Sequence, residues 1–257
     1  MKVIAAALAL TASCIAAGEP LLDFRRDLAF RPEAVESFAQ RAYAQRLDAL
    51  RADGRLDRDP ALLDNVDDVM GPLREAAEAE RPGSSRWNWQ VHSCRRCMEN
   101  ASAMAGGRLL FGEEFIANLR LTRDELGFLV AHEMAHALAE HTREFATAAR
   151  YFVDNGARRD YWDIQHELDD SFAVQYRMAF VAEEQELDAD RIGFILGARA
   201  GFDPSAMLTL LAKLDGGSRP GLLDDHPSIE RRLEQAATML QTARAVYKRF
   251  GVESPAP

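Results

Sequence analysis

Two histidines and a glutamate stand together in a five-residue run that begins at His132 and ends at His136, with Glu133 in second place. A spacing of four residues puts both histidines on one face of a helix, so both imidazoles can bind a single zinc ion. Glu133 lies beside them, where a carboxylate can serve as general base for a water molecule on the metal. The pattern therefore predicts a hydrolytic site with one Zn²⁺ per chain.

A catalytic zinc site needs a third protein ligand as well as an open position for water. Downstream, Glu186 and Asp190 lie four residues apart on one predicted helical face. We expect Glu186 to bind the metal and Asp190 to accept a hydrogen bond from a ligand histidine. His141 is a poorer candidate for a ligand, because five residues beyond His136 it has rotated away from the face of the two histidines.

The helix that carries the two histidines has a clear start signal. Thr122 and Glu125 have the spacing of a capping box, and an apolar run over residues 126–130 follows. Upstream, apolar residues recur at helical spacing over 32–53 and 62–79.

Between these helices the pattern changes to that of strands. Residues 87–93 alternate in polarity, and residues 108–111 follow a glycine turn at 105–107. A small sheet is therefore predicted ahead of the metal-binding helix.

The chain beyond the metal-binding helix is also predicted to be helical. A polar and aromatic segment over 143–170 leads into a long helix that ends at Arg199. Asp203 is a suitable N-cap for a short helix to Leu214, and a last helix runs over 227–249. The fold class predicted from these elements is α+β and mainly helical.

The domain organisation follows from the same pattern. We expect a signal peptide over residues 1–17, an N-terminal helical region over 18–85 packed on the catalytic domain, the catalytic domain over 86–250, and a frayed tail over 251–257.

The N-terminus has the order of a secretory signal, with Lys2, then an apolar stretch, then small residues up to Ala17. We therefore expect an exported protein, in the periplasm or anchored to the outer membrane. The residues up to Cys14 also resemble a bacterial lipobox, in which the cysteine is acylated. Thr11 stands where such a motif usually has leucine, so lipoprotein anchoring and plain periplasmic release remain alternatives.

Cys94 and Cys97 form a short Cys-x-x-Cys motif. A redox pair usually begins a helix in a βαβ unit, whereas here an alternating strand precedes the motif. A zinc knuckle with His92 lacks a second pair and a nearby fourth ligand. The favoured interpretation is a structural disulfide that holds a hairpin turn.

Composition excludes several classes of protein. The chain has 257 residues, 47% of them hydrophobic and 28% charged, which are ordinary globular values. With a net charge of −10, the chain lacks the excess of basic residues that is typical of a nucleic-acid-binding protein. No apolar run is long enough to cross a bilayer as a helix.

Several separate motifs together resemble the M48 family of zinc metallopeptidases, of the gluzincin group. The matching pieces, in family order, are Asn100-Ala101 with Gly106-Gly107, the run from Asp124 through His132-Glu133 and His136 to His141, Glu186 with Ala189-Asp190, and His226-Pro227-Ser228 with Arg232. The sequence departs from the family at 102–104, where an aromatic residue is more usual, and in the long segment 143–185. Neither departure touches a ligand. The resemblance implies a zincin-like metallopeptidase fold.

The resemblance also implies roles for further residues. His226 matches a histidine that hydrogen-bonds the developing oxyanion, and Arg232 is expected to form an ion pair near Asp190. A strand ahead of the metal-binding helix is expected to offer its free edge to an extended peptide, and Asn100 and Gly107 lie in the matching stretch.

The resulting hypothesis is a zinc endopeptidase of the bacterial cell envelope that hydrolyses misfolded or surplus exported proteins. His132, His136 and Glu186 would bind the zinc, and Glu133 would act as the base. The alternative is a metal-binding chaperone or assembly factor for outer-membrane proteins, although the intact Glu133 favours catalysis. The expected partner is an unfolded or extended polypeptide and not a nucleic acid, and any membrane association is through an acylated Cys14. The oligomeric state is left open.

Overall fold

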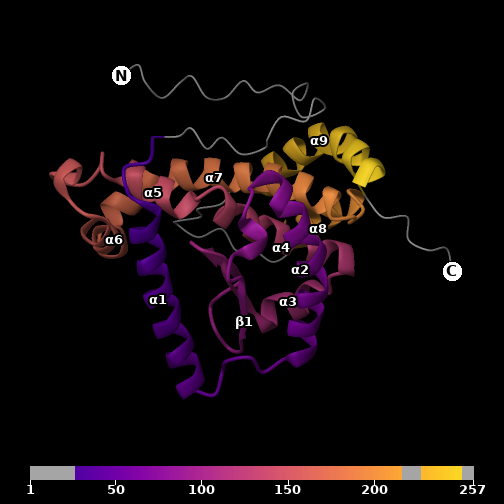
Figure 1. The fold of residues 1–257 in the computed structure, drawn as a ribbon, viewed down its shortest axis with the longest axis horizontal. Coiled ribbons are helices and arrows are strands. Elements are labelled where there is room, and N and C mark those ends of the chain that lie inside the picture. The colour runs from indigo at the N-terminus through magenta and orange to yellow at the C-terminus, as the bar shows by residue number, and fades with distance from the viewer. Residues whose placement is uncertain (1–26, 216–226, 251–257) are drawn as a thin grey trace.

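The computed structural model describes residues 27–215 and 227–250. Helices make up most of this part of the chain, around one small sheet (Figure 1). The helices are α1 (Pro32–Ala52), α2 (Pro60–Glu80), η2 (Ser84–Arg86), α3 (Glu113–Leu119), α4 (Arg123–Leu138), α5 (His141–Ala149), η3 (Gly156–Arg158), α6 (Tyr161–Asp170), α7 (Phe172–Arg199), α8 (Ser205–Asp215) and α9 (Ile229–Phe250). The predicted mainly helical α+β fold is confirmed.

The sheet has three strands, β1 (Gln90–Cys94), β2 (Ala101–Met104) and β3 (Arg108–Gly112), in the order β1-β3-β2. β1 runs parallel to β3, and β2 runs antiparallel to it. The predicted glycine turn joins β2 to β3, where Gly106 and Gly107 have φ of 79° and 80°. Glycine adopts this left-handed conformation without steric cost. β2 is left at one edge of the sheet.

Helices cover both faces of the sheet, with α1 on one side and α2 and α4 on the other (Figure 1). Successive side chains of β3 point to opposite faces, as the pleat requires. Leu109 and Phe111 therefore pack into the main core with α2, α4 and the second half of α7, while Leu110 packs against Tyr43 and Leu47 of α1. The Tyr43 hydroxyl also donates a hydrogen bond to the Leu109 carbonyl at 2.6 Å.

A smaller core joins α5, α6 and the first part of α7 to the N-terminal end of α1. Its buried members include Val35, Ile164 and Met178. Phe30, just ahead of α1, meets the Tyr161 ring edge to face with the centroids 5.4 Å apart. Segment 143–170, for which the sequence indicated only a polar and aromatic character, is largely helical in the structure.

The predicted start of the metal-binding helix is confirmed. The Thr122 hydroxyl accepts a hydrogen bond from the Glu125 backbone N–H at 3.3 Å, and the Glu125 carboxylate accepts one from the Thr122 N–H at 2.7 Å. The same buried carboxylate binds Thr209 and Lys213 of α8 at 2.7 and 2.6 Å. The capping box therefore fixes both the start of α4 and the position of α8.

The Cys94–Cys97 disulfide is present, but its predicted setting in a hairpin is wrong. The two cysteines lie where the chain leaves β1, and β1 pairs in parallel with β3 rather than antiparallel with β2. The hairpin of the sheet is instead the β2–β3 pair. The disulfide closes a short turn in the connection between two strands that are not neighbours.

No helix in the described part of the chain combines the length and the apolar character needed to cross a membrane.

Candidate metal centre

Helices α4 and α7 meet at the centre of the fold and bring the predicted ligands together. α4 carries His132 and His136 one turn apart, and α7 carries Glu186 opposite them. The two Nε2 atoms are 3.2 Å apart. Glu186 places one oxygen 3.3 Å from His132 Nε2 and the other 3.2 Å from His136 Nε2. Three side chains therefore direct their ligating atoms, the two Nε2 atoms and the Glu186 carboxylate, towards one point.

These spacings fit a zinc ion. Tetrahedral ligands at about 2.0–2.1 Å from zinc lie roughly 3.3 Å from one another. The two Nε2 atoms are 3.2 Å apart, and each lies 3.2 or 3.3 Å from the nearer oxygen of the Glu186 carboxylate. Two imidazoles and one carboxylate are also a donor set typical of catalytic zinc. Within 27–215 and 227–250, this is the one group of three or more His, Cys, Asp or Glu side chains arranged to hold a metal.

Charge at the site favours a cation. Burial lowers the pKa of His132, but the carboxylates of Glu186 and Asp190 outweigh it and raise the pKa to about 10. Burial raises the pKa of Glu186, but the two histidines outweigh that effect and hold it well below its usual range. The pocket therefore stabilises positive charge strongly, and a divalent cation would compete with protons for the same lone pairs.

Asp190 lies behind His132 and fixes its orientation. One carboxylate oxygen lies 3.0 Å from His132 Nδ1. The Arg232 guanidinium donates two hydrogen bonds of 2.7 Å to the same carboxylate. Because a carboxylate can only accept, His132 donates a hydrogen bond from Nδ1, and a metal would therefore replace the proton on Nε2.

His141 lies behind His136, a position that the sequence analysis did not predict. Its Nδ1 is 3.0 Å from His136 Nδ1, and its Nε2 is 3.3 Å from Asp188. The prediction assumed that the helix continues beyond His136. In fact α4 ends at Leu138, and Glu140 takes the left-handed conformation with φ of 58°. The turn starts a new helix and brings His141 back against His136.

The predicted substrate contacts lie outside this cluster. The Asn100 carbonyl accepts a hydrogen bond from Gly112 at 2.8 Å, and the Gly107 carbonyl accepts one from Gln90 at 2.9 Å. A Cβ on Gly107 would lie 2.8 Å from the Trp89 ring. Both residues therefore have a role in turn and sheet structure.

Two other predicted residues, His226 and Cys14, lie outside the described residues, as does the predicted signal peptide over 1–17. Their roles stay predictions.

The close approach of α4 and α7 depends on Gly193. A Cβ at this position would lie 2.9 Å from both Cα and N of His132. These are backbone atoms, so the contact cannot be relieved by rotating a side chain.

We expect Gly193→Ala to destabilise the protein by about 1–3 kcal/mol through overpacking. The substitution should also weaken zinc binding, because it pushes Glu186 away from the two histidines. Urea unfolding and competition with a zinc chelator measure the two effects. Alanine normally stabilises a helix relative to glycine by about 1 kcal/mol. A gain in stability with unchanged zinc affinity would therefore contradict the close-packing argument.

Comparison with known proteins agrees with this geometry. The profile of Peptidase family M48 matches residues 65–240. Among curated proteins, the chain is 29% identical over 171 residues to the mitochondrial metalloendopeptidase OMA1 of Schizosaccharomyces pombe. The matched region covers 63% of this chain and 50% of the relative. The Arabidopsis thaliana protein of the same name is 27% identical over 65% of this chain and 36% of the relative. The human OMA1 metalloendopeptidase is 26% identical, over 63% of this chain and 34% of the relative. The chain spans half or less of the length of these relatives.

The names of these relatives correct one prediction. All three are named as mitochondrial proteins, which contradicts the predicted location in the periplasm or at the outer membrane. An N-terminal pattern of charge, apolar stretch and small residues was too general a signal to settle the compartment.

Proposed function

The chain belongs to peptidase family M48 and is a zinc metalloendopeptidase, and we propose on this premise that it hydrolyses peptide bonds in extended or unfolded polypeptides. The observation that carries the proposal is the meeting of His132, His136 and Glu186 at one point, with Glu133 next to the first of them on α4.

Each side chain of the centre has a distinct task. His132 and His136 offer Nε2 lone pairs, and Glu186 offers a carboxylate oxygen. When bound there, zinc would lower the pKa of a water molecule towards about 7 and polarise the scissile carbonyl. Asp190 and Arg232 keep the His132 ring in place while this chemistry occurs.

Glu133 is the proposed general base. It is mostly buried, with 7% of its surface exposed, on the helical turn that carries both histidines. In the proposed step, its carboxylate takes a proton from the attacking water and then gives it to the leaving amine nitrogen as the peptide C–N bond breaks. The water oxygen forms the new C–O bond, so the products are one carboxylate and one amine.

The sheet supplies a place for the peptide backbone. β2 is an edge strand, and its Ala101 and Ala103 pack against the main core that contains α4. An extended peptide could add to the free edge of β2 through main-chain hydrogen bonds, a mode that tolerates many side chains. This is why we propose extended or unfolded polypeptides as substrates.

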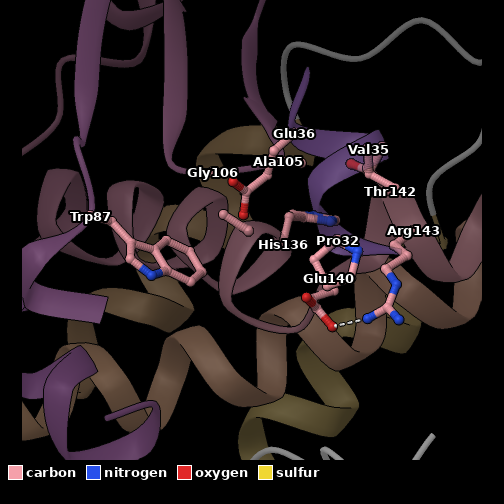
Figure 2. Close-up of a pocket in the computed structure, with 11 residues that line it drawn as sticks. Pro32, Val35, Glu36, Trp87, Ala105, Gly106, His136, Glu140, Thr142 and Arg143 are labelled. Atoms are coloured by element: carbon pink, nitrogen blue, oxygen red, sulfur yellow. Dashed lines mark hydrogen bonds and ion pairs between the residues drawn. The ribbon is translucent and has the colours of Figure 1, made fainter. Parts of the chain in front are cut away.

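A pocket beside His136 could receive a substrate side chain. Its empty space is about 320 Å³, part of it open to solvent. Figure 2 shows His136 between Trp87 on one side and Pro32 and Arg143 on the other. Arg143 is paired with Glu140 at 2.8 Å. Pro32, Val35 and Trp87 give the pocket apolar walls, which favour an apolar substrate side chain, and Glu36 adds one acidic group to the lining.

Cleavage of an unfolded protein tests the proposal. We expect the purified full chain to contain one zinc per molecule by metal analysis and to cut reduced, alkylated casein. A strong chelator should abolish cleavage, and added zinc should restore it. Binding of zinc and of casein without any cut peptide bond would contradict the proposal and favour the chaperone alternative.

The ligand assignment has its own test. We expect Glu186→Ala to lose stoichiometric zinc after dialysis, because only two protein ligands remain. Glu184→Ala is the matched control, since Glu184 is exposed on the same helix and pairs with Arg231 instead. Metal analysis of both variants decides the matter. Full zinc occupancy in Glu186→Ala would remove this residue as the third ligand.

A further inference from the structure

His141 joins the metal centre to a second charged pair on α7. It is 2% exposed and lies between His136 and Asp188. Asp188 in turn accepts hydrogen bonds of 3.1 and 2.7 Å from the Arg191 guanidinium. The resulting chain runs from His136 through His141 and Asp188 to Arg191, without a break.

The chemistry of these groups fixes where each proton lies. A carboxylate held by an arginine only accepts hydrogen bonds, so His141 must carry a proton on the Nε2 that faces Asp188. A neutral imidazole then has a bare Nδ1, which can only accept. Its neighbour at 3.0 Å is His136 Nδ1, so that atom must carry the proton. The neutral, metal-binding form of His136 then has its lone pair on Nε2, the atom that faces Glu186 and His132.

We propose that His141 is a positioning residue that holds His136 in its metal-binding tautomer and ring orientation. The inference rests on the proposed zinc-binding role of His136. His141 is not itself a fourth ligand, because its Nδ1 points at the back of the His136 ring and its Nε2 is directed to Asp188.

Each of the two ligand histidines is thus held by its own set of hydrogen bonds to an aspartate of α7. His132 contacts Asp190 directly, and Arg232 holds that carboxylate. His136 contacts the His141 imidazole instead, and this second ring bridges it to Asp188. Both carboxylates stand on one turn of α7, next to Glu186. A single helix therefore supplies the third ligand and both supports of the other two.

The backbone of His141 is held separately from its ring. Gln185 donates a hydrogen bond of 3.0 Å to the His141 carbonyl and one of 3.1 Å to Glu144. These contacts fix the start of α5 but touch neither ring nitrogen. Gln185 therefore offers a control that separates loss of local structure from loss of the imidazole.

Three variants test the inference by zinc affinity. His141→Leu removes the acceptor for His136 Nδ1, and we expect zinc to bind about 10–100-fold more weakly in chelator competition. His141→Asn keeps a short side chain with a carbonyl oxygen that can accept the same hydrogen bond, and it should recover most of that loss. Gln185→Leu should lower the free energy of unfolding but leave zinc affinity near that of the wild type.

Cobalt substitution provides a spectroscopic readout. We expect the visible absorption of the Co²⁺ form to change in His141→Leu and to return towards that of the wild type in His141→Asn. Equal zinc affinity and equal Co²⁺ spectra in His141→Leu and the wild type would overturn the inference. So would equal losses of affinity in His141→Leu and Gln185→Leu, since the role would then be structural only.

A measurement on the wild type avoids dependence on folding of the variants. Two-bond ¹H–¹⁵N spectra of the zinc-loaded protein report which ring nitrogen carries the proton. We expect Nδ1 for His136 and Nε2 for His141, and the opposite tautomer of His141 would overturn the inference. A wild-type chain that binds no zinc would instead refute the proposed function, so the two failures are distinguishable.

Discussion

Replacing Glu133 by glutamine should lower kcat by between about 10²- and 10⁴-fold, the range that a positioned general base contributes. Glutamine has nearly the same shape but cannot take the proton from water at neutral pH. The three ligands are untouched, so the variant should keep one zinc per chain. Steady-state kinetics on an unfolded substrate, together with metal analysis of the same preparation, measure both quantities.

The outcome separates base from ligand. A Glu133→Gln variant that loses zinc would show that Glu133 helps to bind the metal. A variant with full zinc and wild-type kcat would place the base elsewhere. KM is expected to change little, because the proposed role of Glu133 is to transfer protons during the reaction and not to bind the peptide in the ground state. Glu184→Ala, on the exposed side of α7, should leave kcat and zinc unchanged.

The metal ligands could be predicted because local rules determine them. A spacing of four residues on a helix decides which side chains share a face, and the Thr122–Glu125 capping box showed that α4 is a helix. Glu186 followed from the number of ligands that zinc requires. None of these steps needed the tertiary structure.

The surroundings of the ligands depended on features that sequence patterns do not reveal. His141 was placed on a continuing helix, whereas the left-handed Glu140 reverses the chain. Asp188 lies close to Glu183, Glu184 and Glu186 in the sequence, so its residue type alone does not distinguish it from its acidic neighbours. The parallel pairing of β1 with β3 joins strands that are not consecutive, so alternation alone suggested a hairpin. In each case a contact between distant segments determined the structure.

Removing Asp190 should destabilise the protein more than any other change considered above. Its carboxylate and the Arg232 guanidinium are almost completely buried, with 3% and 7% of their side chains exposed. Taking away one partner leaves the other charge buried without compensation, which costs about 3–5 kcal/mol. We therefore expect Asp190→Ala to lower the free energy of unfolding by that amount. Urea unfolding with a chelator present measures it without the contribution of bound zinc.

A double variant separates this cost from the role of Asp190 at the metal. Asp190→Leu with Arg232→Met replaces the buried ion pair by apolar side chains, and such replacements are often neutral or stabilising. Stability should therefore recover. Zinc affinity should stay about 10–100-fold below that of the wild type, because His132 Nδ1 still lacks its acceptor. Recovery of both would mean that the pair serves the core alone, whereas recovery of stability without zinc affinity means that Asp190 orients the ligand.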